Sequence, residues 1–284
     1  MLRSLFSAIS GLRANQFMLD VTGNNIANAN TVGYKSSNVV FQDTLSQMLT
    51  GGAAPTATSG GTNPIQVGLG VQVGGVSSNF GQGSAQVTGK ATNLMIAGDG
   101  FFTVQRNGEN LFTRAGAFDF DSVGNLVTPD GDIVQGYAAD ATTGAITASG
   151  TPTDISIPDV ATENATNPLK SYNIGPDGVI TGVFADGTKR PLFQIALGNF
   201  ANPGGLDKIG DTSFRSSTNS GAVQYGAPAT GRRGAITGGQ LEMSNVDLAQ
   251  EFTNLIIAQR GFQATSRVIT TSDQVLEELV NIKR

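Results

Sequence analysis

Hydrophobic residues recur with helical spacing at both ends of the chain. Near the N-terminus they lie mostly three or four residues apart, with Gln16 and Gly23 as interruptions, at Leu2, Leu5, Ile9, Leu12, Leu19 and Ile26. Near the C-terminus they recur every seven residues, at Leu248, Leu255, Phe262, Ile269 and Leu276. Such stripes lie on one face of a helix. The pattern therefore predicts a long amphipathic helix at each end.

Prolines and caps agree with this placement of the helices. All 10 prolines lie between Pro55 and Pro228, so both predicted helices lack the residue that breaks a helix interior. Ser244 to Asp247 precedes the C-terminal stripe and offers an N-cap with an acidic residue at the helix start. Two interpretations of the stripes stay open: they pack on the protein's own core, or they pack on other copies of the chain.

The middle of the chain has the pattern of strands and tight turns. A stretch rich in Gly, Ala and Thr within residues 46–66 predicts a flexible linker. From Val67 onward, short apolar runs alternate with turn signals such as Asp130-Gly131, Asp177-Gly178 and Asp186-Gly187. We therefore expect a β-rich, mostly antiparallel body, with a surface excursion at residues 138–168.

These elements predict an α+β protein with four segments. The N-terminal helix and the residues after it occupy residues 1–45, and the linker occupies residues 46–66. The β-rich domain spans residues 67–240, and the C-terminal helix spans residues 241–284.

Composition narrows the classes of function. The net charge is −5 and Lys and Arg do not cluster, which argues against a nucleic-acid partner. The chain has no Cys, His or Trp, which excludes thiol nucleophiles, imidazole bases and structural zinc sites. No apolar run is long enough to span a membrane, and the first residues lack the apolar core of a cleavable signal peptide.

Two motifs resemble a nucleotide-binding site and a calcium site, but each departs from the pattern that such a site requires. Gly98-Asp99-Gly100 opens like a dinucleotide fingerprint, but Thr103 stands at the third glycine position. Asp119, Asp121 and Asp130 have the spacing of a calcium loop, yet the segment has the sequence of a β-turn. We expect no enzyme, no cofactor and no metal.

Longer stretches of the chain resemble a known family. The segment LDVTGNNIANANTVGYKSSNVVFQD, from Leu19 to Asp43, resembles the N-terminal signature of the flagellar rod and hook family. The C-terminal segment from Leu241 to Arg284 resembles the family's terminal helix, and pieces such as GDGFFTV resemble its middle. The residues at the signature positions are Asn24, Asn25, Ala27, Asn28, Thr31, Gly33, Tyr34 and Lys35.

The resemblance implies a tubular polymer. The two terminal helices would pair like a coiled coil in an inner domain around an export channel, with the β-rich domain outside. The inner helices would contact other subunits of the polymer through Leu5, Ile9, Leu12, Leu248, Leu255, Phe262, Ile269 and Leu276. The resemblance favours a short hook protein of the Gram-positive type, a flexible joint that transmits torque from rod to filament. The alternative is a distal rod protein, and a remote alternative is a secreted adhesin or carbohydrate-active protein.

The same resemblance implies partners and a location. The partners would be further copies of the chain, the distal rod protein, the hook–filament junction protein, a hook cap and the flagellar type III export apparatus. The protein would be extracellular, in the hook or basal body, and exported without a cleaved signal peptide.

Overall fold

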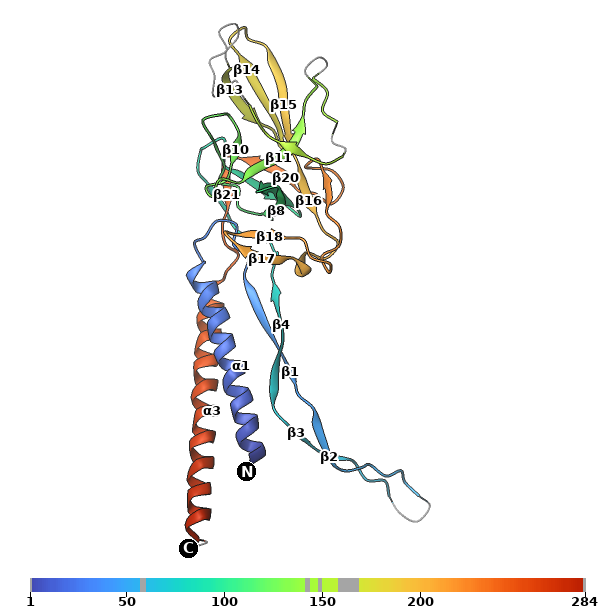
Figure 1. Cartoon of the computed structure of the whole chain (residues 1–284), viewed down its shortest axis with the longest axis vertical. Coiled ribbons are helices and arrows are strands. Elements are labelled where there is room, and N and C mark those ends of the chain that lie inside the picture. The colour runs from blue at the N-terminus through green and yellow to red at the C-terminus, as the bar shows by residue number, and fades with distance from the viewer. Residues whose placement is uncertain (1, 57–59, 141–143, 148–149, 158–168, 283–284) are drawn as a thin grey trace. The chain divides into compact units, whose positions relative to one another are not determined.

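The structure is a computed structural model that describes residues 2–56, 60–140, 144–147, 150–157 and 169–282 (Figure 1). The chain forms two compact units. The first, the helix unit, contains Met1–Ala27, Ser37–Asn79 and Val246–Arg284. The second, the β-rich unit, contains Asn28–Ser36 and Phe80–Asn245.

The helix unit contains the two long helices that the sequence predicted near the two ends of the chain, and they lie side by side (Figure 1). They are α1 (Leu2–Ala27) and α3 (Leu248–Ile282). Asp247 is the N-cap of α3, because its Oδ1 accepts hydrogen bonds from the backbone N–H groups of Ala249 and Gln250. An Asp at this position satisfies N–H groups that have no partner within the helix.

A continuous line of buried and half-buried side chains, the helix seam, marks where the two helices pack. On α1 it consists of Leu5, Ala8, Leu12, Asn15, Leu19, Thr22 and Ile26. On α3 it consists of Glu251, Leu255, Ala258, Phe262, Thr265, Ile269, Ser272 and Leu276. On each helix these positions alternate three and four residues apart, so large apolar residues alternate mainly with small or polar ones.

The helices approach closely where the seam residues are small. A β-carbon at Gly261 would come 2.7 Å from Oδ1 of Asn15, and one at Gly11 would come 3.2 Å from Cγ2 of Thr265. Asn25 donates a hydrogen bond to Glu251. Numbers that rise on α1 fall on α3 in these three pairs, so the helices are antiparallel.

A pair of hairpin segments completes the helix unit. Strand β1 (Ser37–Asp43) pairs antiparallel with β4 (Val71–Ser78), and β2 (Ser46–Thr50) pairs antiparallel with β3 (Ile65–Gly68). The predicted linker at residues 46–66 therefore contains paired strands, and its residues 57–59 lie outside the described residues. Residues 67–79, predicted as part of the β-rich domain, group with the helices because β4 pairs with β1.

The β-rich unit is built around one sheet of 13 strands. Its main strand order is β13-β14-β15-β11-β7-β8-β18-β17, with β9, β10, β12, β16 and β19 paired beside this path. Two smaller sheets pair β20 with β6 and β21 with β5. All pairings between these named strands are antiparallel, which confirms the predicted strand arrangement.

The bounds of these elements follow in chain order. The first group is β5 (Ala85–Val87), β6 (Leu94–Ala97), β7 (Phe101–Arg106), β8 (Glu109–Thr113), β9 (Asp119–Phe120), β10 (Leu126–Val127), β11 (Ile133–Ala138) and β12 (Thr153–Asp154). The second group is β13 (Leu169–Ile174), β14 (Val179–Phe184), β15 (Lys189–Ile195), β16 (Leu197–Asn199), the 3-10 helix η1 (Pro203–Gly205), β17 (Asp207–Gly210), β18 (Ser213–Arg215), β19 (Gln224–Gly226), β20 (Ala235–Gly238) and β21 (Gln240–Glu242).

Two apolar clusters fill this unit. The larger one includes the buried side chains of Phe102, Val104, Leu126, Ile155 and Ile195. The smaller consists of four phenylalanines, Phe101, Phe112, Phe200 and Phe214. The rings of Phe112 and Phe200 meet edge to face with centroids 4.7 Å apart, a favoured geometry for aromatic pairs.

The predicted turns are present, and one predicted surface segment is partly core. Gly131, Gly178 and Gly187 all have positive φ, as their turn positions require. Ile155 and Ile157, however, are buried in the larger cluster, so the segment 138–168 is not wholly a surface excursion. Its residues 141–143, 148–149 and 158–168 lie outside the described residues.

Candidate functional site

Asn25, a signature residue near the end of α1, holds three segments of the helix unit together. Its Oδ1 accepts a hydrogen bond from Ser37 N at 3.0 Å, and its Nδ2 donates to Ser37 O at 2.8 Å. The same Nδ2 donates to Glu251 Oε1 at 3.1 Å, in the first turn of α3. The side chain is buried, so both ends of its amide need partners. Asn25 therefore fixes the start of β1 and the start of α3 against α1.

Lys35, a second signature residue, enters the interior of the β-rich unit. Its Nζ donates to Glu242 Oε1 at 2.6 Å and to Gly81 O at 2.8 Å. Glu242 lies on β21 and also accepts hydrogen bonds from Gly83 N at 2.9 Å and from Arg114 at 3.3 Å. The side chains of Lys35 and Glu242 are both fully buried. A buried charge needs such partners to stay ionised.

This buried group contains two cations and one carboxylate. Burial lowers the pKa of Lys35, against the raising effect of its bond to Glu242. Burial also lowers the pKa of Arg114, whose guanidinium carbon lies 5.3 Å from the centre of the Phe101 ring. Nε of Arg114 has no hydrogen-bond partner among the described residues. The single carboxylate of Glu242 therefore serves both buried cations, and its loss would be costly.

Backbone contacts seat the rest of the segment in the β-rich unit. Gly33 has a φ of +70° and donates its N–H to Glu242 O at 2.8 Å. A β-carbon at Gly33 would overlap the backbone of Ala115, so glycine is required there for both conformation and space. Asn245 accepts a hydrogen bond from Ser36 N at 2.8 Å and donates to Gly81 O at 3.0 Å.

The remaining signature residues make smaller contacts. Thr31 donates to Asn28 Oδ1 at 3.1 Å, which closes the turn after α1. Tyr34 is half-buried, and Nζ of Lys208 lies 5.3 Å from the centre of its ring. Asn24 is exposed on α1. The sequence singled these residues out together, and the structure shows that Asn25 and Lys35 make the buried contacts.

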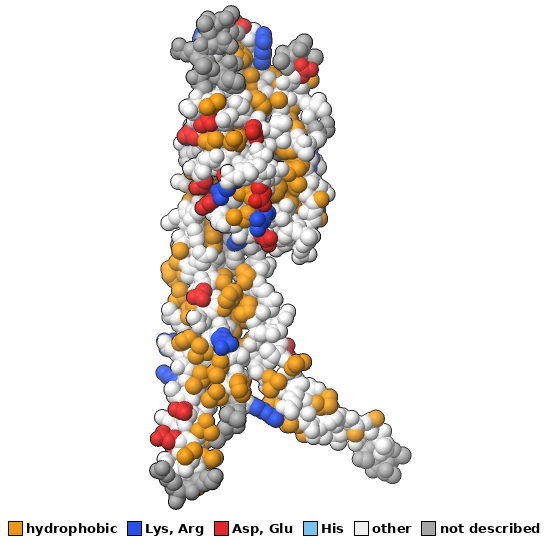
Figure 2. All heavy atoms as spheres, in the orientation of Figure 1, with side chains coloured by type: hydrophobic (Ala, Val, Ile, Leu, Met, Phe, Trp, Pro, Cys, Tyr) orange, Lys and Arg blue, Asp and Glu red, His pale blue; other side chains and the backbone are white. Residues whose placement is uncertain are grey.

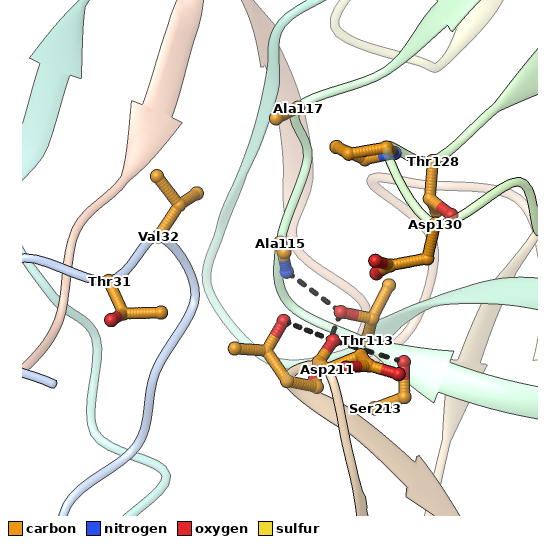
Figure 3. A pocket seen from close by; sticks show the side chains of 11 residues that line it. Thr31, Val32, Thr113, Ala115, Ala117, Thr128, Asp130, Asp211 and Ser213 are labelled. Atoms are coloured by element: carbon orange, nitrogen blue, oxygen red, sulfur yellow. Dashed lines mark hydrogen bonds between the residues drawn. The ribbon is translucent and has the colours of Figure 1, made fainter.

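A small pocket lies beside the segment in the β-rich unit (Figure 3). Its volume is about 320 Å³, and Thr31 and Val32 form one side. The other side comes from three turns and includes Thr113, Asp130 and Asp211. Its hydroxyl groups bind within the pocket wall: Thr113 donates to Thr212 O at 3.1 Å and accepts from Ala115 N at 3.0 Å. These bonds stabilise the turns that form the wall of the pocket.

The predicted helix contacts fall on several surfaces. Leu255, Phe262, Ile269 and Leu276 are half-buried in the helix seam, as are Leu5 and Leu12. Ile9 lies instead on a different face of α1, where it lines a groove next to β4. Leu248 is 44% exposed and lies outside the seam. The seam thus covers most of the predicted residues within one chain.

Other apolar side chains of the helix unit are exposed (Figure 2). On α3 a second stripe runs outside the seam and includes Ile257, Val268, Val275, Leu279 and Ile282. On α1, Phe6 and Phe17 are exposed on the groove. Figure 2 shows hydrophobic side chains gathered along the helices and along the hairpin segments. Exposed apolar surface of this extent marks an interaction site.

Sequence reasoning missed the acidic partners of this site. Glu242 and Glu251 lie in the C-terminal segment that carried the resemblance, but no local pattern pairs them with Lys35 and Asn25. Across the described ranges, no cluster of three or more acidic side chains is arranged to hold a metal ion. Neither described helix combines the length and apolar content that crossing a bilayer requires.

Three family models match the chain. The model described as Flagella basal body rod protein matches residues 5–35. Flagellar hook protein FlgE/F/G D1 domain matches residues 95–182, and Flagellar basal body rod FlgEFG protein C-terminal matches residues 237–282. The range 5–35 covers the signature residues up to Lys35, and the range 237–282 covers all of α3.

Full-length relatives agree with these matches. The chain is 47% identical over 285 residues to Flagellar basal-body rod protein FlgG of Bacillus subtilis (strain 168), covering 100% of both chains. It is 36% identical over 281 residues to Flagellar basal-body rod protein FlgG of Caulobacter vibrioides, covering 97% of both. Flagellar hook protein FlgE of Borreliella burgdorferi is 32% identical over 442 residues, again covering 100% of both chains.

These relatives change the preference stated from the sequence. The rod proteins align with this chain at almost equal length, whereas the alignment with the hook protein runs over 442 residues and requires long insertions. They therefore favour the alternative, a rod protein, over the hook protein. The signature segment, the C-terminal helix, the family models and the full-length relatives together show that the chain belongs to the flagellar rod and hook family of structural axial proteins.

Proposed function

We propose that this chain is a structural subunit of the distal rod of the flagellar basal body. The observation that carries the proposal is the 47% identity to a basal-body rod protein with full coverage of both chains and no large insertion. The subunit polymerises with copies of itself along the flagellar axis. Its role is mechanical, and none of its residues is assigned a catalytic step.

Within the polymer, α1 and α3 pair as a coiled coil and form the inner wall around the export channel. The alternating spacing of the helix seam and the close approach at Gly261 support this pairing. The second stripe on α3 contacts neighbouring copies, and the β-rich unit lies outside. The buried contacts of Asn25 and Lys35 hold the signature segment in one conformation in each unit, as a rigid shaft requires.

The proposal extends to the route and the neighbours. The subunit leaves the cell through the flagellar type III export apparatus without a cleaved signal peptide. Its axial neighbours are other rod subunits and the first hook subunits.

The hook protein is the second candidate, because hook relatives also align over the whole chain. In that case the hook cap and the hook–filament junction protein would be partners, and the polymer would be curved and flexible.

Deletion of the gene in the source bacterium separates the two candidates. Isolated basal bodies would be examined by electron microscopy, with a plasmid copy of the gene as the complementation control. A distal rod subunit predicts basal bodies that lack the distal rod and carry no hook. Basal bodies with a complete rod and no hook would overturn the proposal in favour of the hook protein.

A further inference from the structure

The helix unit contains a groove on the face of α1 that does not pack on α3. Phe6, Arg13 and Phe17 of α1 and Val71 and Val73 of β4 are among the residues that line it, and its volume is about 530 Å³. Seam residues such as Leu5 and Leu12 are each one position away from Phe6 and Arg13, a rotation of roughly 100° around the helix. The groove is therefore separate from the surface that the chain's own α3 covers.

Contacts between α1 and β4 shape the groove. Ser10 Oγ accepts a hydrogen bond from Val71 N at 3.3 Å, which holds the start of β4 against α1. A side chain at Gly70 would collide with Ser10, so the approach needs glycine there. Phe6 is 66% exposed and Phe17 is 38% exposed on the rim. The groove is thus a formed, largely apolar surface with one cation, Arg13.

The C-terminal turns of α3 extend beyond the start of α1. The three pairs Asn25–Glu251, Asn15–Gly261 and Gly11–Thr265 follow one antiparallel register. Continued along both helices, this register places Leu2 level with Gln274. The turns after Leu276, the α3 overhang, lie beyond the described residues of α1 in this register. Leu279 is 56% exposed and Ile282 is 85% exposed, in agreement with that position.

Charge distinguishes the two surfaces. The N-terminal half of α1 carries Arg3 and Arg13 and no acidic residue. Among its described residues, the overhang carries Glu277 and Glu278. Glu278 is three residues after Val275 and four before Ile282, so these three side chains share one face of the helix. Glu277 points from another face. An apolar stripe flanked by a carboxylate thus matches an apolar groove that contains an arginine.

We propose that the α3 overhang of one copy occupies the α1–β4 groove of a second copy, with Glu278 paired to Arg13. This contact rests on the proposed function, since it requires self-association. Groove and overhang are different surfaces, so each copy donates one and receives one. Such a head-to-tail contact extends into an open polymer and does not close into a dimer.

Cysteine cross-linking tests the contact directly, because the chain has no Cys. The double variant Val73→Cys with Ile282→Cys is assembled and oxidised, then separated on a denaturing gel without reductant. We expect a ladder of dimers, trimers and longer species that reductant removes. The matched control, Val123→Cys with Ile282→Cys, places the first cysteine at an exposed site of the β-rich unit and should give no ladder.

Two results would overturn the contact. One is polymer formation without a ladder, which would leave the proposed function intact and show that the overhang binds elsewhere. The other is an internal cross-link that leaves a monomer, which would show that the overhang folds back on its own chain. A wild-type chain that does not polymerise at high concentration, together with a double-cysteine variant that gives no ladder, would overturn both proposals.

Charge reversal provides a second measurement. Arg13→Glu and Glu278→Arg should each raise the critical concentration for assembly about tenfold, and their combination in one chain should restore it. Glu277→Arg is the matched control, with the same change of charge on the other face, and should leave the critical concentration unchanged. Failure of the combined variant to recover would contradict the pairing of Glu278 with Arg13.

Discussion

Lys35 Nζ donates a hydrogen bond of 2.6 Å to Glu242 Oε1, and neither side chain is exposed to solvent. The two residues are 207 positions apart in the sequence. Their pairing joins the signature segment to β21, the last strand before α3, inside the β-rich unit. Arg114, which lies in the middle of the chain and belongs to the β-rich unit, pairs with the same carboxylate. The stability of the β-rich unit therefore depends on the buried carboxylate of Glu242.

Replacing Glu242 by Gln should lower the free energy of unfolding of the β-rich unit by about 3–5 kcal/mol, because Lys35 and Arg114 would stay buried without a negative partner. Urea denaturation of the full chain, followed by circular dichroism, measures the loss. Asp119→Asn is the matched control, since it removes the acid of the exposed pair with Lys90. That variant should cost less than about 1 kcal/mol. Equal losses in the two variants would contradict the assigned role of Glu242.

Substituting alanine for glycine should have opposite effects at two positions of the N-terminal region. Gly33→Ala should destabilise the β-rich unit by about 1–3 kcal/mol or more, because the new β-carbon overlaps Ala115 at a positive φ. Gly23→Ala lies inside α1 with no atom within 4 Å of the new β-carbon, and should stabilise the helix by about 0.5–1 kcal/mol. Denaturation midpoints of both variants test this. A neutral or stabilising shift in Gly33→Ala would show that the close approach to Ala115 is not what requires glycine there. A destabilising shift in Gly23→Ala would contradict the predicted gain in helix stability.

The helix pair should be far less stable in the free subunit than in the polymer. Only Glu251 and Ala258 are buried among the described side chains of α3. The free energy gained by burying the seam is therefore too small to offset the conformational entropy lost when the 35 residues of the helix become ordered. We expect weak amide protection across α3 in dilute monomer and strong protection after assembly, measured by hydrogen exchange. Strands β7 and β11 are the internal control and should be protected in both states. Strong protection from Leu248 to Leu279 in dilute monomer would refute the coupling of folding to assembly.

The turn between β9 and β10 should make the β-rich unit sensitive to acid. Hydrogen bonds from the backbone and side chain of Asn125 and from Val123 N hold the pKa of Asp121 below its usual range. Since the pKa is lower in the folded chain, this stabilisation is present above the ordinary Asp pKa of about 3.9 and is lost as the pH falls through the lowered pKa.

Asp121→Asn should therefore flatten the fall of the melting temperature between about pH 5 and pH 2. Ser122→Ala, in the same turn and without a carboxylate, should keep the full fall of the wild-type chain. If the melting temperature of Asp121→Asn falls with acid as steeply as that of the wild-type chain, other carboxylates determine the sensitivity to acid.

Features set by local physics were predictable from the sequence. The seven-residue stripe from Leu248 to Leu276 predicted α3, because helical periodicity is local and a side chain every seventh residue returns to one face. The turns at Gly131, Gly178 and Gly187 were predictable for a similar reason, since each needs a positive φ that glycine adopts without strain. The α+β class follows from these local patterns alone.

The sequence predicted less well which residues of α1 face α3, and the reason is steric. Hydrophobicity placed Ile9 on the stripe with Leu5 and Leu12, but Ala8 and Asn15 occupy the seam and Ile9 lines the groove. Antiparallel helices that approach as closely as Gly261 and Asn15 need small residues between the large ones. A sequence pattern weighted by hydrophobicity selects the large side chains and misses the small ones.

The sequence by itself determined which residues belong to the signature, but not what they bind. Asn25 and Lys35 stand ten residues apart in one motif, yet their buried partners Glu251 and Glu242 lie more than 200 positions away. Only the tertiary structure brings these groups together, because a buried charge or amide is satisfied by whichever group the fold places within hydrogen-bond distance. The same holds for the groove: its apolar surface exists only because β4 returns along α1.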